Sequence, residues 1–269
     1  MKTKEQILET NVKQKEFYNH KKKNFATRVW SSIREKTLKK IRKNIGILDE
    51  SYALHKQWFG DLSQKKVLDL GCYAGNSLSM HLARNAKQYI GVDLSDVAIE
   101  KLNQRLVEIP TAHALAVDFL SDEFEEKDFD IIYAYGVLHH FPNVDVLIAK
   151  LQEKLAPEGV VISYDPLETS LPIKLIRMLY RPFQSDAAWE WPFTRKTFYK
   201  YDKAFQIVER RGLLGKSKWF FLLGFLPIAE EKRLEIGKRW HRNDWELSAT
   251  STSRLFSCMH VTMLMRKRN

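Results

Sequence analysis

Apolar and polar positions change their rhythm along the chain at about residue 66. From there, five short apolar runs occupy residues 66–70, 88–94, 113–119, 130–136 and 159–165. Helix-like stretches separate most of these runs and cover residues 76–86, 95–108 and 143–155. Short strands that alternate with helices of roughly 10–15 residues are typical of crossover units. The pattern therefore predicts an α/β fold with a mostly parallel sheet.

The first 60 residues have a different pattern, which indicates helices. Apolar residues recur there at roughly helical spacing, with lysine and arginine between them, at Val29, Ile33, Ile41, Ile45 and Leu48. Such a basic amphipathic helix has two possible roles at this point. It packs its apolar stripe on the neighbouring domain, or it lies on an anionic membrane surface.

The alternation loosens after Asp165. Residues 166–193 are rich in proline and aromatic residues and are expected to form an inserted cap. Beyond the cap we expect a helix near 196–211, a strand near 216–223, a polar helical insertion near 228–253 and a last strand at 258–267. No clear crossover helix separates the two late strands, so they are expected to pair antiparallel at the sheet edge.

Composition favours a folded protein in a reducing compartment. With 269 residues, 44% of them hydrophobic, the chain can bury a sizeable core. The first residues hold no apolar run of the kind found in signal peptides, and the longest apolar run, 219–229, is about half the length of a membrane-spanning helix. Cys72 and Cys258 give neither a disulfide framework nor metal-ligand spacing. We therefore expect a cytoplasmic protein without a bound metal.

The net charge of +11 is distributed unevenly. Residues 1–66 carry a balance of +10, residues 67–159 carry −8, and residues 160–269 carry +9. Basic flanks around an acidic middle suggest attraction to an anionic substrate or surface. Solvated, lysine-rich helix faces would give the same pattern, so both interpretations stay open.

The ends of the first four apolar runs carry the side chains that we expect to form a ligand site. In open α/β sheets the ligand lies outside the carboxyl ends of the strands. Asp93 stands 24 residues after Asp69, near the spacing at which an acidic residue meets a ribose diol. Asp118 and Phe119 offer a hydrogen-bond acceptor and an aromatic face for a purine. Tyr135 ends the fourth run, and the segment GVLHHF follows it.

The loop GCYAGN after the first run is poorly suited to a dinucleotide. A G-x-G-x-x-G loop needs its second glycine so that the backbone can approach a pyrophosphate. Here Tyr73 takes the place of the second glycine and Asn76 that of the third. The loop still makes a tight turn, but NAD and FAD are disfavoured. A nucleoside cofactor without phosphates does not need that close approach.

Five segments, in this order and spacing, resemble class I S-adenosylmethionine-dependent methyltransferases, and most closely the branch that methylates small molecules, lipids and quinones. They are VLDLGCYAG, YIGVDLS, AVDF, FDIIYAYGVLHHF and LAPEGVVISY. The resemblance implies a Rossmann-like sheet of seven strands, mostly parallel, with an antiparallel last strand. It also implies a methyltransferase domain over residues 61–269, with insertions at about 166–195 and 226–256. A helical extension or lid would then cover residues 1–60.

The resemblance also assigns the contacts to S-adenosylmethionine (SAM), whose product is S-adenosylhomocysteine. In the family's terms, Asp93 accepts from the ribose hydroxyls, Asp118 accepts from the adenine amino group, and Tyr135 lies near the sulfonium. Tyr73 either covers the amino-acid end of the cofactor or packs on the N-terminal helices. Tyr18 is a further candidate, because N-terminal segments of this family often fold over the site. The expected cofactor-binding residues are Asp69, Gly71, Cys72, Tyr73, Gly75, Asp93, Leu94, Asp118, Phe119, Tyr135, Gly136 and Tyr18.

The chemistry of the acceptor is less constrained. A hydroxyl acceptor needs a base, and His139 or His140 follows the fourth strand at the right end of the sheet, although one of them is often structural in this branch. The cap suits an amphiphile with an anionic part, or it is simply a packed lid. Its candidate substrate-binding residues are Tyr180, Arg181, Trp189, Trp191 and Arg195.

Three functions are therefore compared. The leading one is O-methylation of a small or lipid-linked metabolite, with peripheral contact to an anionic membrane as a possible accompaniment. The second is an RNA methyltransferase whose basic flanks contact phosphates, which would make binding fall steeply with salt. The third is a non-catalytic binding partner that kept the fold, although the acidic residues at 69, 93 and 118 argue against it.

Overall fold

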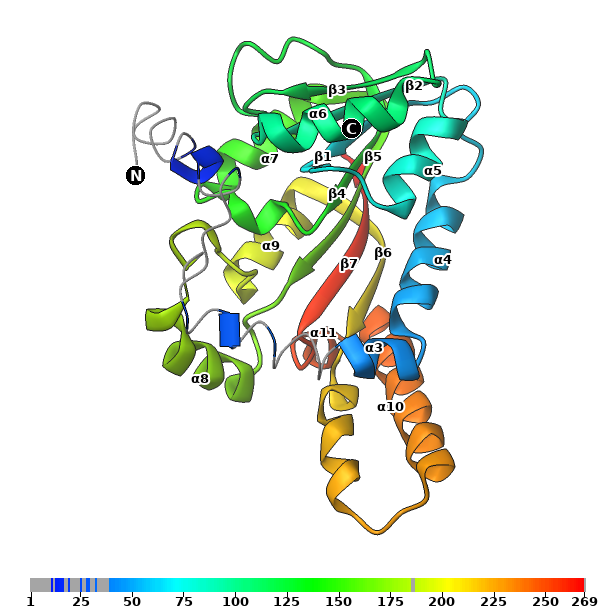
Figure 1. Ribbon diagram of the computed structural model, residues 1–269, viewed down its shortest axis with the longest axis vertical. Helices are drawn as coiled ribbons and strands as arrows, with labels where there is room; N and C mark the ends of the chain where they lie inside the picture. The colour runs from blue at the N-terminus through cyan, green and yellow to red at the C-terminus, as the bar shows by residue number, and fades with distance from the viewer. Residues whose placement is uncertain are drawn as a thin grey trace.

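A seven-stranded sheet organises the chain, and the computed structural model describes residues 11, 13–16, 19, 25, 28–29, 32, 39–184 and 187–268 (Figure 1). The strand order is β3-β2-β1-β4-β5-β7-β6, in which β1 to β5 are parallel and β7 pairs antiparallel with both β5 and β6. The strands are β1 (Lys66–Leu70), β2 (Gln88–Asp93), β3 (Ala112–Ala116), β4 (Phe129–Tyr135), β5 (Leu155–Pro166), β6 (Phe205–Leu213) and β7 (His260–Lys267). The predicted mostly parallel sheet with an antiparallel last strand is confirmed.

Helices cover both faces of this sheet. Hydrophobic side chains of α4, α5 and α6 pack on one face, and those of α7, α9 and α11 pack on the other. The helices are α3 (Lys40–Asn44), α4 (Ile47–Phe59), α5 (Ser77–Asn85), α6 (Asp96–Leu106), α7 (Val144–Lys154), α8 (Leu171–Tyr180), α9 (Arg195–Ala204), α10 (Glu230–Thr250) and α11 (Thr252–Leu255). Short 3₁₀ helices are η2 (Leu138–His140), η3 (Arg181–Phe183), η4 (Ala187–Trp189) and η5 (Lys216–Phe225).

Side-chain caps fix where the crossover helices begin. The Asn76 side chain accepts from the backbone amides of Leu78 and Ser79 at the start of α5. Ser95 caps α6 and Asn143 caps α7 in the same manner. Each cap satisfies amide groups that have no partner within the helix. The three helices therefore begin on the side of the sheet where β1, β2 and β4 end.

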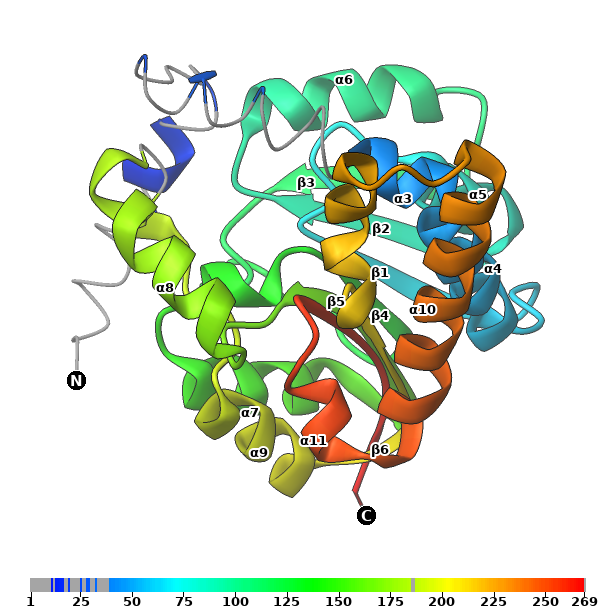
Figure 2. The same cartoon turned by 90° about the horizontal axis from the view of Figure 1, so that it is seen from below.

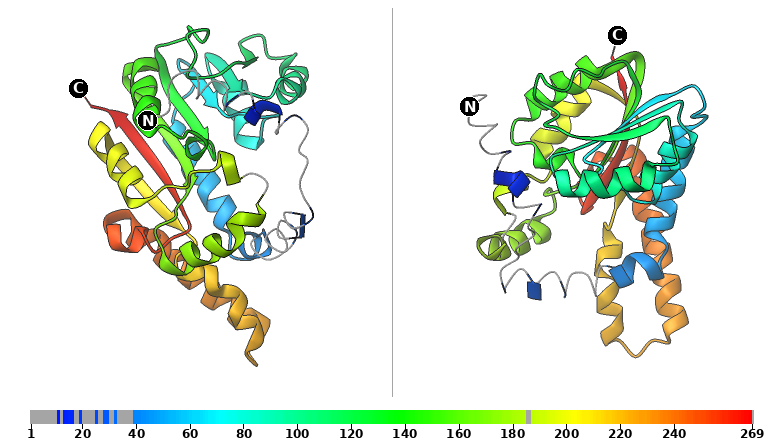
Figure 3. Two further views of the ribbon diagram at one scale, coloured as in Figure 1. Left: turned by 90° about the vertical axis from the view of Figure 1, so that its left-hand side faces the viewer. Right: turned by 45° about the horizontal axis from the view of Figure 1, so that its top comes forward.

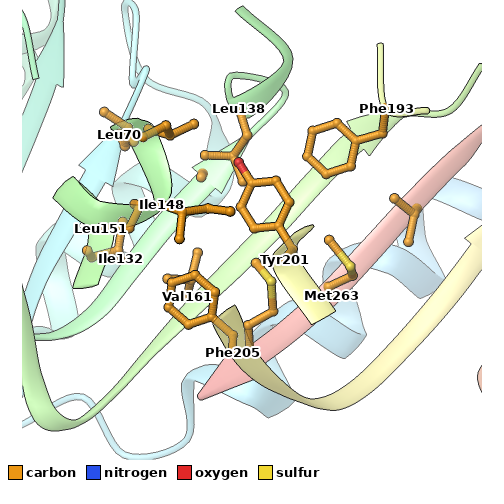
Figure 4. Packing of buried hydrophobic residues seen from close by; sticks show 14 of the residues in the cluster. Leu70, Ile132, Leu138, Ile148, Leu151, Val161, Phe193, Tyr201, Phe205 and Met263 are labelled. Atoms are coloured by element: carbon orange, nitrogen blue, oxygen red, sulfur yellow. The ribbon is translucent and has the colours of Figure 1, made fainter. Parts of the chain in front are cut away.

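Apolar residues alternate along the parallel strands, so each strand contributes side chains to a hydrophobic core on either face of the sheet. Val67 and Ile131 point to the face covered by α4, α5 and α6, whereas Leu68 and Ile132 belong to the core under α7 and α9. Figure 4 shows the second core, where Tyr201 of α9 packs among Ile148, Phe205 and Met263. Both faces of the sheet are buried, as expected for a parallel sheet between helical layers.

Two elements in the last third differ from the sequence prediction. The helix expected over 196–211 ends at Ala204, and residues 205–213 form strand β6 instead. The strand expected near 216–223 is wrong, because those residues form the 3₁₀ helix η5. Strand β6 lies at the edge of the sheet and carries the charged run Glu209-Arg210-Arg211, so it lacks the apolar character of the buried strands. The helical insertion expected near 228–253 corresponds to α10 and is confirmed.

Two additions project from the domain. Helix α8 follows β5, and η5 with α10 forms a helical hairpin after β6, which is the orange element at the bottom of Figure 1. Figure 2 shows the same hairpin beside α3 and α4, and Gly237 of α10 leaves room for Phe220 of η5 to pack close to it. The hairpin therefore has an apolar contact of its own, where a side chain at position 237 would collide with the Phe220 ring.

Candidate functional site

A cavity of about 300 Å³ opens at the carboxyl ends of β1, β2 and β4. This is the point at which the strand order reverses from β2-β1 to β4, and open α/β sheets bind ligands at such switch points. The cavity is lined by Asn11, Gln14, Leu70, Gly71, Tyr73, Val92, Asp93, Leu94, Val117, Asp118, Phe119, Tyr135, Gly136, Val137, His140 and Phe141. Eight of the twelve predicted cofactor contacts and one of the two predicted histidines are among them.

The loop after β1 turns tightly because of its backbone conformation. Gly71 has a φ of 69°, and a Cβ atom there would stand 2.4 Å from the Val137 side chain. Gly75 also has a positive φ, of 74°. Tyr73 adopts a φ of 48°, which is uncommon for a residue with a side chain. Its backbone amide donates to Oδ2 of Asp93 at 3.0 Å, so the carboxylate at the end of β2 holds the loop in place.

Asp69, Cys72 and Gly75 support the loop and do not line the cavity. Asp69 is fully buried and accepts a hydrogen bond from the Tyr89 hydroxyl at 2.8 Å. Burial raises the pKa of this carboxyl to about 6, against the lowering effect of its hydrogen bonds. The Cys72 thiol is also buried, and burial raises its pKa well above the ordinary value. Arg105 donates to the carbonyl of Gly75.

Two carboxylates stand at the ends of β2 and β3. Asp93 accepts from the backbone amide of Ser95 at 2.9 Å as well as from that of Tyr73. Asp118 accepts from the backbone amide of Leu120 with Oδ1, and from the side-chain amide of Asn11 with Oδ2 at 2.6 Å. Each carboxylate oxygen can accept more than one hydrogen bond, and both carboxylates line the cavity.

Aromatic side chains form one wall and the floor of the cavity. Phe119 is buried and packs against Phe124 and Phe141, at ring distances of 5.9 and 6.4 Å. Tyr135 stacks on Tyr164 at 4.6 Å, and burial raises the pKa of its phenol. Gly136, beside it, has a φ of 72°, and a Cβ atom built there meets no atom of the described residues within 4 Å. This glycine therefore leaves open space at the end of β4.

A series of hydrogen bonds joins His55 of α4 to strands β4 and β7 of the sheet. The hydroxyl of Thr262 donates to the carbonyl of Ser163 at 2.7 Å, so its oxygen accepts from Nε2–H of His55 at 2.7 Å. Nδ1 of His55 then accepts from the Tyr133 hydroxyl at 3.2 Å. These partners require the neutral ring, and burial lowers the pKa of His55 to about 4.

The two adjacent histidines of η2 have different surroundings. His139 is buried, and its Nδ1 lies 2.9 Å from a carboxylate oxygen of Asp165. Its backbone amide donates to the same oxygen, and its carbonyl accepts from the Trp191 amide at 2.7 Å. His140 lines the cavity, and its Nδ1 lies 2.7 Å from the carbonyl of Trp189. Because a carbonyl only accepts, Nδ1 of His140 carries the proton, and the lone pair of the neutral ring is on Nε2.

Burial raises the pKa of Asp165 to about 7, while its hydrogen bond from His139 and the nearby His140 lower it. Among the residues that the structure describes, the second carboxylate oxygen of Asp165 is buried without a hydrogen-bond partner. Asp165 therefore fixes His139, whose ring lies 4.1 Å from that of His140.

The cap, residues 166–193, contacts the site with its own main-chain groups. Trp189 and Trp191 bind the two histidines with main-chain groups, as described above. Arg181 is exposed, and Arg195 lies 5.3 Å from the centre of the Phe256 ring. Neither arginine lines the cavity. Tyr180 ends α8, and its side chain lies outside the described part of the structure.

The part of the chain that the structure describes contains no helix that is both long and apolar enough to cross a membrane. In the same residues, no three or more His, Cys, Asp or Glu side chains come together in a group that could hold a metal ion.

Comparison with known proteins identifies the family. The family described as "Methyltransferase domain" matches residues 23–212 of the chain. The chain belongs to this methyltransferase family. The predicted class I SAM-dependent methyltransferase identity is thereby confirmed.

Individual relatives align with only part of the methyltransferase chain. An uncharacterized protein of Haemophilus influenzae is 32% identical over 108 residues, which are 38% of this chain and 42% of that protein. A ubiquinone biosynthesis O-methyltransferase of Pasteurella multocida is 29% identical over 111 residues, 37% of this chain and 46% of that protein. The alignments thus span less than half the length of either relative.

The solved structure of geranyl diphosphate C-methyltransferase from Streptomyces coelicolor A3(2) superposes on the methyltransferase with a TM-score of 0.53 and 15% sequence identity. The superposition covers 87% of this chain and 86% of that chain. At this identity the likeness shows a shared fold.

Two polar residues of the methyltransferase cavity were not expected from the sequence. Asn11 and Gln14 are buried and line the cavity from the N-terminal segment. The same segment is joined to α6 by Lys15, which forms an ion pair with Asp96 at 2.9 Å. No motif marks these polar residues. Tyr18, the residue predicted from this segment, lies outside the described residues.

Proposed function

We propose that this methyltransferase binds SAM in the cavity at the ends of β1, β2 and β4, and methylates an oxygen atom of a small or lipid-linked metabolite that carries an anionic part. The observation that carries the proposal is the juxtaposition of a nucleoside-sized cavity, two carboxylates and the oriented imidazole of His140. SAM is the cofactor implied by the family, and the fit of the cavity to it rests on three features.

The first feature is the pair of carboxylates. Asp93 would accept from the ribose hydroxyls and Asp118 from the adenine amino group, because both are carboxylates at strand ends and both line the cavity. The second is the aromatic and aliphatic wall of Phe119 and Leu94, which suits a purine face. The third is Gly136, where the absence of a side chain leaves space at the end of β4.

When bound, SAM supplies a methyl group that is already activated on a sulfonium sulfur. The protein's contribution is then to align the acceptor and to remove its proton. His140 is the residue of the pair whose ring lines the cavity, and in the neutral tautomer with the proton on Nδ1 its Nε2 is the nitrogen that can take up the acceptor's proton. The carbonyl of Trp189 orients this ring. His139 is buried against Asp165 and would position its neighbour.

The acceptor class is supported by charge and by the relatives. One relative is, by its name, an O-methyltransferase of ubiquinone biosynthesis. The geranyl diphosphate C-methyltransferase was solved with Mg²⁺, S-adenosyl-L-homocysteine and geranyl diphosphate, which is an anion. Basic residues outnumber acidic ones on both flanks of the domain, which favours an anionic acceptor. The predicted lid over residues 1–60 is supported by Asn11 and Gln14, which line the cavity. The cytoplasmic location stays a prediction from composition.

Cofactor binding is tested by titration calorimetry of the full chain with SAM. Asp93→Ala and Asp118→Ala should each weaken binding about 10- to 100-fold, because each removes a charged acceptor. Glu100→Ala, on the exposed face of α6, is the matched control and should bind as the wild type does. Thermal unfolding of each variant distinguishes lost contacts from lost folding. Failure of the wild type to bind SAM would overturn the proposal.

Methyl transfer is tested by incubating extract fractions with the protein and methyl-labelled SAM. Label should enter lipid or small-molecule material, and mass spectrometry should locate it on oxygen. Label in RNA, with binding that falls steeply with salt, would favour the alternative of an RNA methyltransferase. His140→Ala should lower kcat by about 10²–10⁴ while SAM affinity is retained. An unchanged kcat in that variant would remove His140 as the base.

A further inference from the structure

Two segments expose large apolar side chains to solvent. The first is the α8–η3 segment, residues 171–183, and the second is the η5 segment, residues 216–226. Leu179 in the first is 72% exposed and Phe225 in the second is 82% exposed. The other exposed apolar residues of the two segments are Leu171, Leu175, Ile176, Met178, Phe183, Phe221, Leu222 and Leu226. A cluster of this kind marks an interaction surface more often than isolated exposed residues do.

Both segments carry basic residues and lack acidic ones. Residues 169–185 contain three lysine or arginine residues and no aspartate or glutamate, and residues 214–229 contain two and none. Lys174 of α8 and Lys216 of η5 are exposed. Exposed leucine and phenylalanine interleaved with lysine and arginine are the features of segments that lie in an anionic membrane interface.

The topology brings the two segments to one edge of the sheet. Strands β5 and β6 both pair antiparallel with β7, so they run in the same direction. Helix α8 follows the end of β5, and η5 follows the end of β6. Both segments therefore leave the edge at which β1, β2 and β4 also end, which is the edge that holds the cavity. Figure 3 shows α8 and the helical hairpin projecting from the same end of the molecule.

We propose that the α8–η3 and η5 segments together form a docking surface for an anionic lipid membrane, with their apolar side chains inserted among the headgroups. The surface would hold the cavity edge close to the bilayer. Its charge argues against a second copy of this chain as the occupant. A two-fold interface buries the same surface of both copies, so the exposed lysine and arginine residues of the two segments would face those of the second copy, which disfavours that occupant.

The test is co-sedimentation of the full chain with vesicles of phosphatidylcholine alone and with phosphatidylserine added. The wild type should bind the anionic vesicles and leave the neutral ones largely unbound. Leu179→Ser and Phe225→Ser should each lower the partition coefficient about tenfold, since each removes one inserted apolar side chain. The double variant Lys174→Gln/Lys216→Gln should lower it about tenfold on anionic vesicles only.

Val107→Ser is the matched control. Val107 is 79% exposed, but it follows α6 before β3 begins and so lies at the opposite edge of the sheet. It should partition as the wild type does. Absence of wild-type binding to anionic vesicles would overturn the proposal, and so would equal losses in Val107→Ser and Phe225→Ser. A wild-type oligomer that becomes monomeric in Phe225→Ser, without vesicle binding, would assign the surface to a second copy instead. Because SAM affinity is measured separately, failure here leaves the proposed methyl transfer untouched.

Discussion

The buried His55 makes folding stability depend on pH in a way that can be calculated. Its folded pKa is about 4, against 6.5 for an ordinary histidine, because burial disfavours the imidazolium. Between these values the unfolded chain binds the proton more tightly than the folded protein does. Stability from this group is therefore present above pH 6.5 and is lost as pH falls toward 4.

The size of the loss follows from the same two values. At pH 5, the unfolded histidine is almost fully protonated and His55 is almost fully neutral. The 1.5 pH units from 6.5 to 5, at about 1.4 kcal/mol each, cost about 2 kcal/mol. Protonation would also turn Nδ1 into a donor facing the Tyr133 hydroxyl, which now donates to it. At pH 5 the cost is therefore that of keeping His55 neutral while the same histidine in the unfolded chain takes up a proton.

The assay is urea unfolding of the wild type and His55→Gln at pH 8 and pH 5. The variant should be less stable than the wild type at pH 8. Its free energy of unfolding should then fall between pH 8 and pH 5 by about 2 kcal/mol less than that of the wild type. Other titrating groups, including Asp69 and Asp165, are present in both proteins and cancel in this difference. His113→Gln, at an exposed histidine, is the control and should keep the wild-type pH dependence. Equal losses in the wild type and His55→Gln would refute the reasoning.

Three further predictions concern the supports of the cavity. Gly71→Ala should lower the free energy of unfolding by roughly 2–4 kcal/mol, because the positive φ and the 2.4 Å approach to Val137 both oppose a methyl group. Tyr89→Phe should cost about 1–3 kcal/mol at pH 7 by removing the donor to ionised Asp69, and less at pH 5, where Asp69 is largely protonated in the folded state. Asn76→Ala should cost about 1 kcal/mol through loss of the α5 cap. Chemical unfolding measures all three.

Matched variants sharpen these expectations. Gly136→Ala shares the positive φ but meets no atom, so it should cost only the backbone strain, about 1 kcal/mol. A loss as large as that of Gly71→Ala would contradict the packing argument. Tyr199→Phe and Ser77→Ala are exposed counterparts of the other two changes and should be close to neutral. If Tyr89→Phe lowers the free energy of unfolding more at pH 5 than at pH 7, the hydrogen bond to ionised Asp69 does not explain its effect.

The parallel half of the fold could be predicted because its signals are local and strong. Buried strands such as β1 and β2 are recognisable in the sequence as short apolar runs. A polar cap residue such as Asn76 or Ser95 then marks the start of the next helix. The edge strand β6 gives neither signal. Its pairing with β7 shifts register between Ile207 and Glu209, and Arg210 donates to carbonyls at the end of α10. That partner is about 40 residues away along the chain, so no local pattern reveals it.

The candidate site divides in a similar way. Asp93 and Asp118 could be named from the sequence because strand ends converge at one edge of a parallel sheet. The sequence could not show which of the two histidines lines the cavity. His139 and His140 are neighbours in one turn, and their surroundings differ because Asp165 and Trp189, which are distant in sequence, contact one ring each. Asn11 and Gln14 could not be found either, because single polar residues in a helical segment carry no pattern of their own.

The additions that follow β5 and β6 have an evolutionary consequence. Apart from Tyr18, the expected cofactor contacts come from the compact stretch between Asp69 and Gly136, whereas α8, η5 and α10 lie later in the chain and none of their described residues lines the cavity. Mutations that reshape these additions leave the strands and caps around the cavity unchanged. Related proteins can therefore diverge in their substrates or in the surfaces to which they bind. The site for the methyl donor can stay the same throughout.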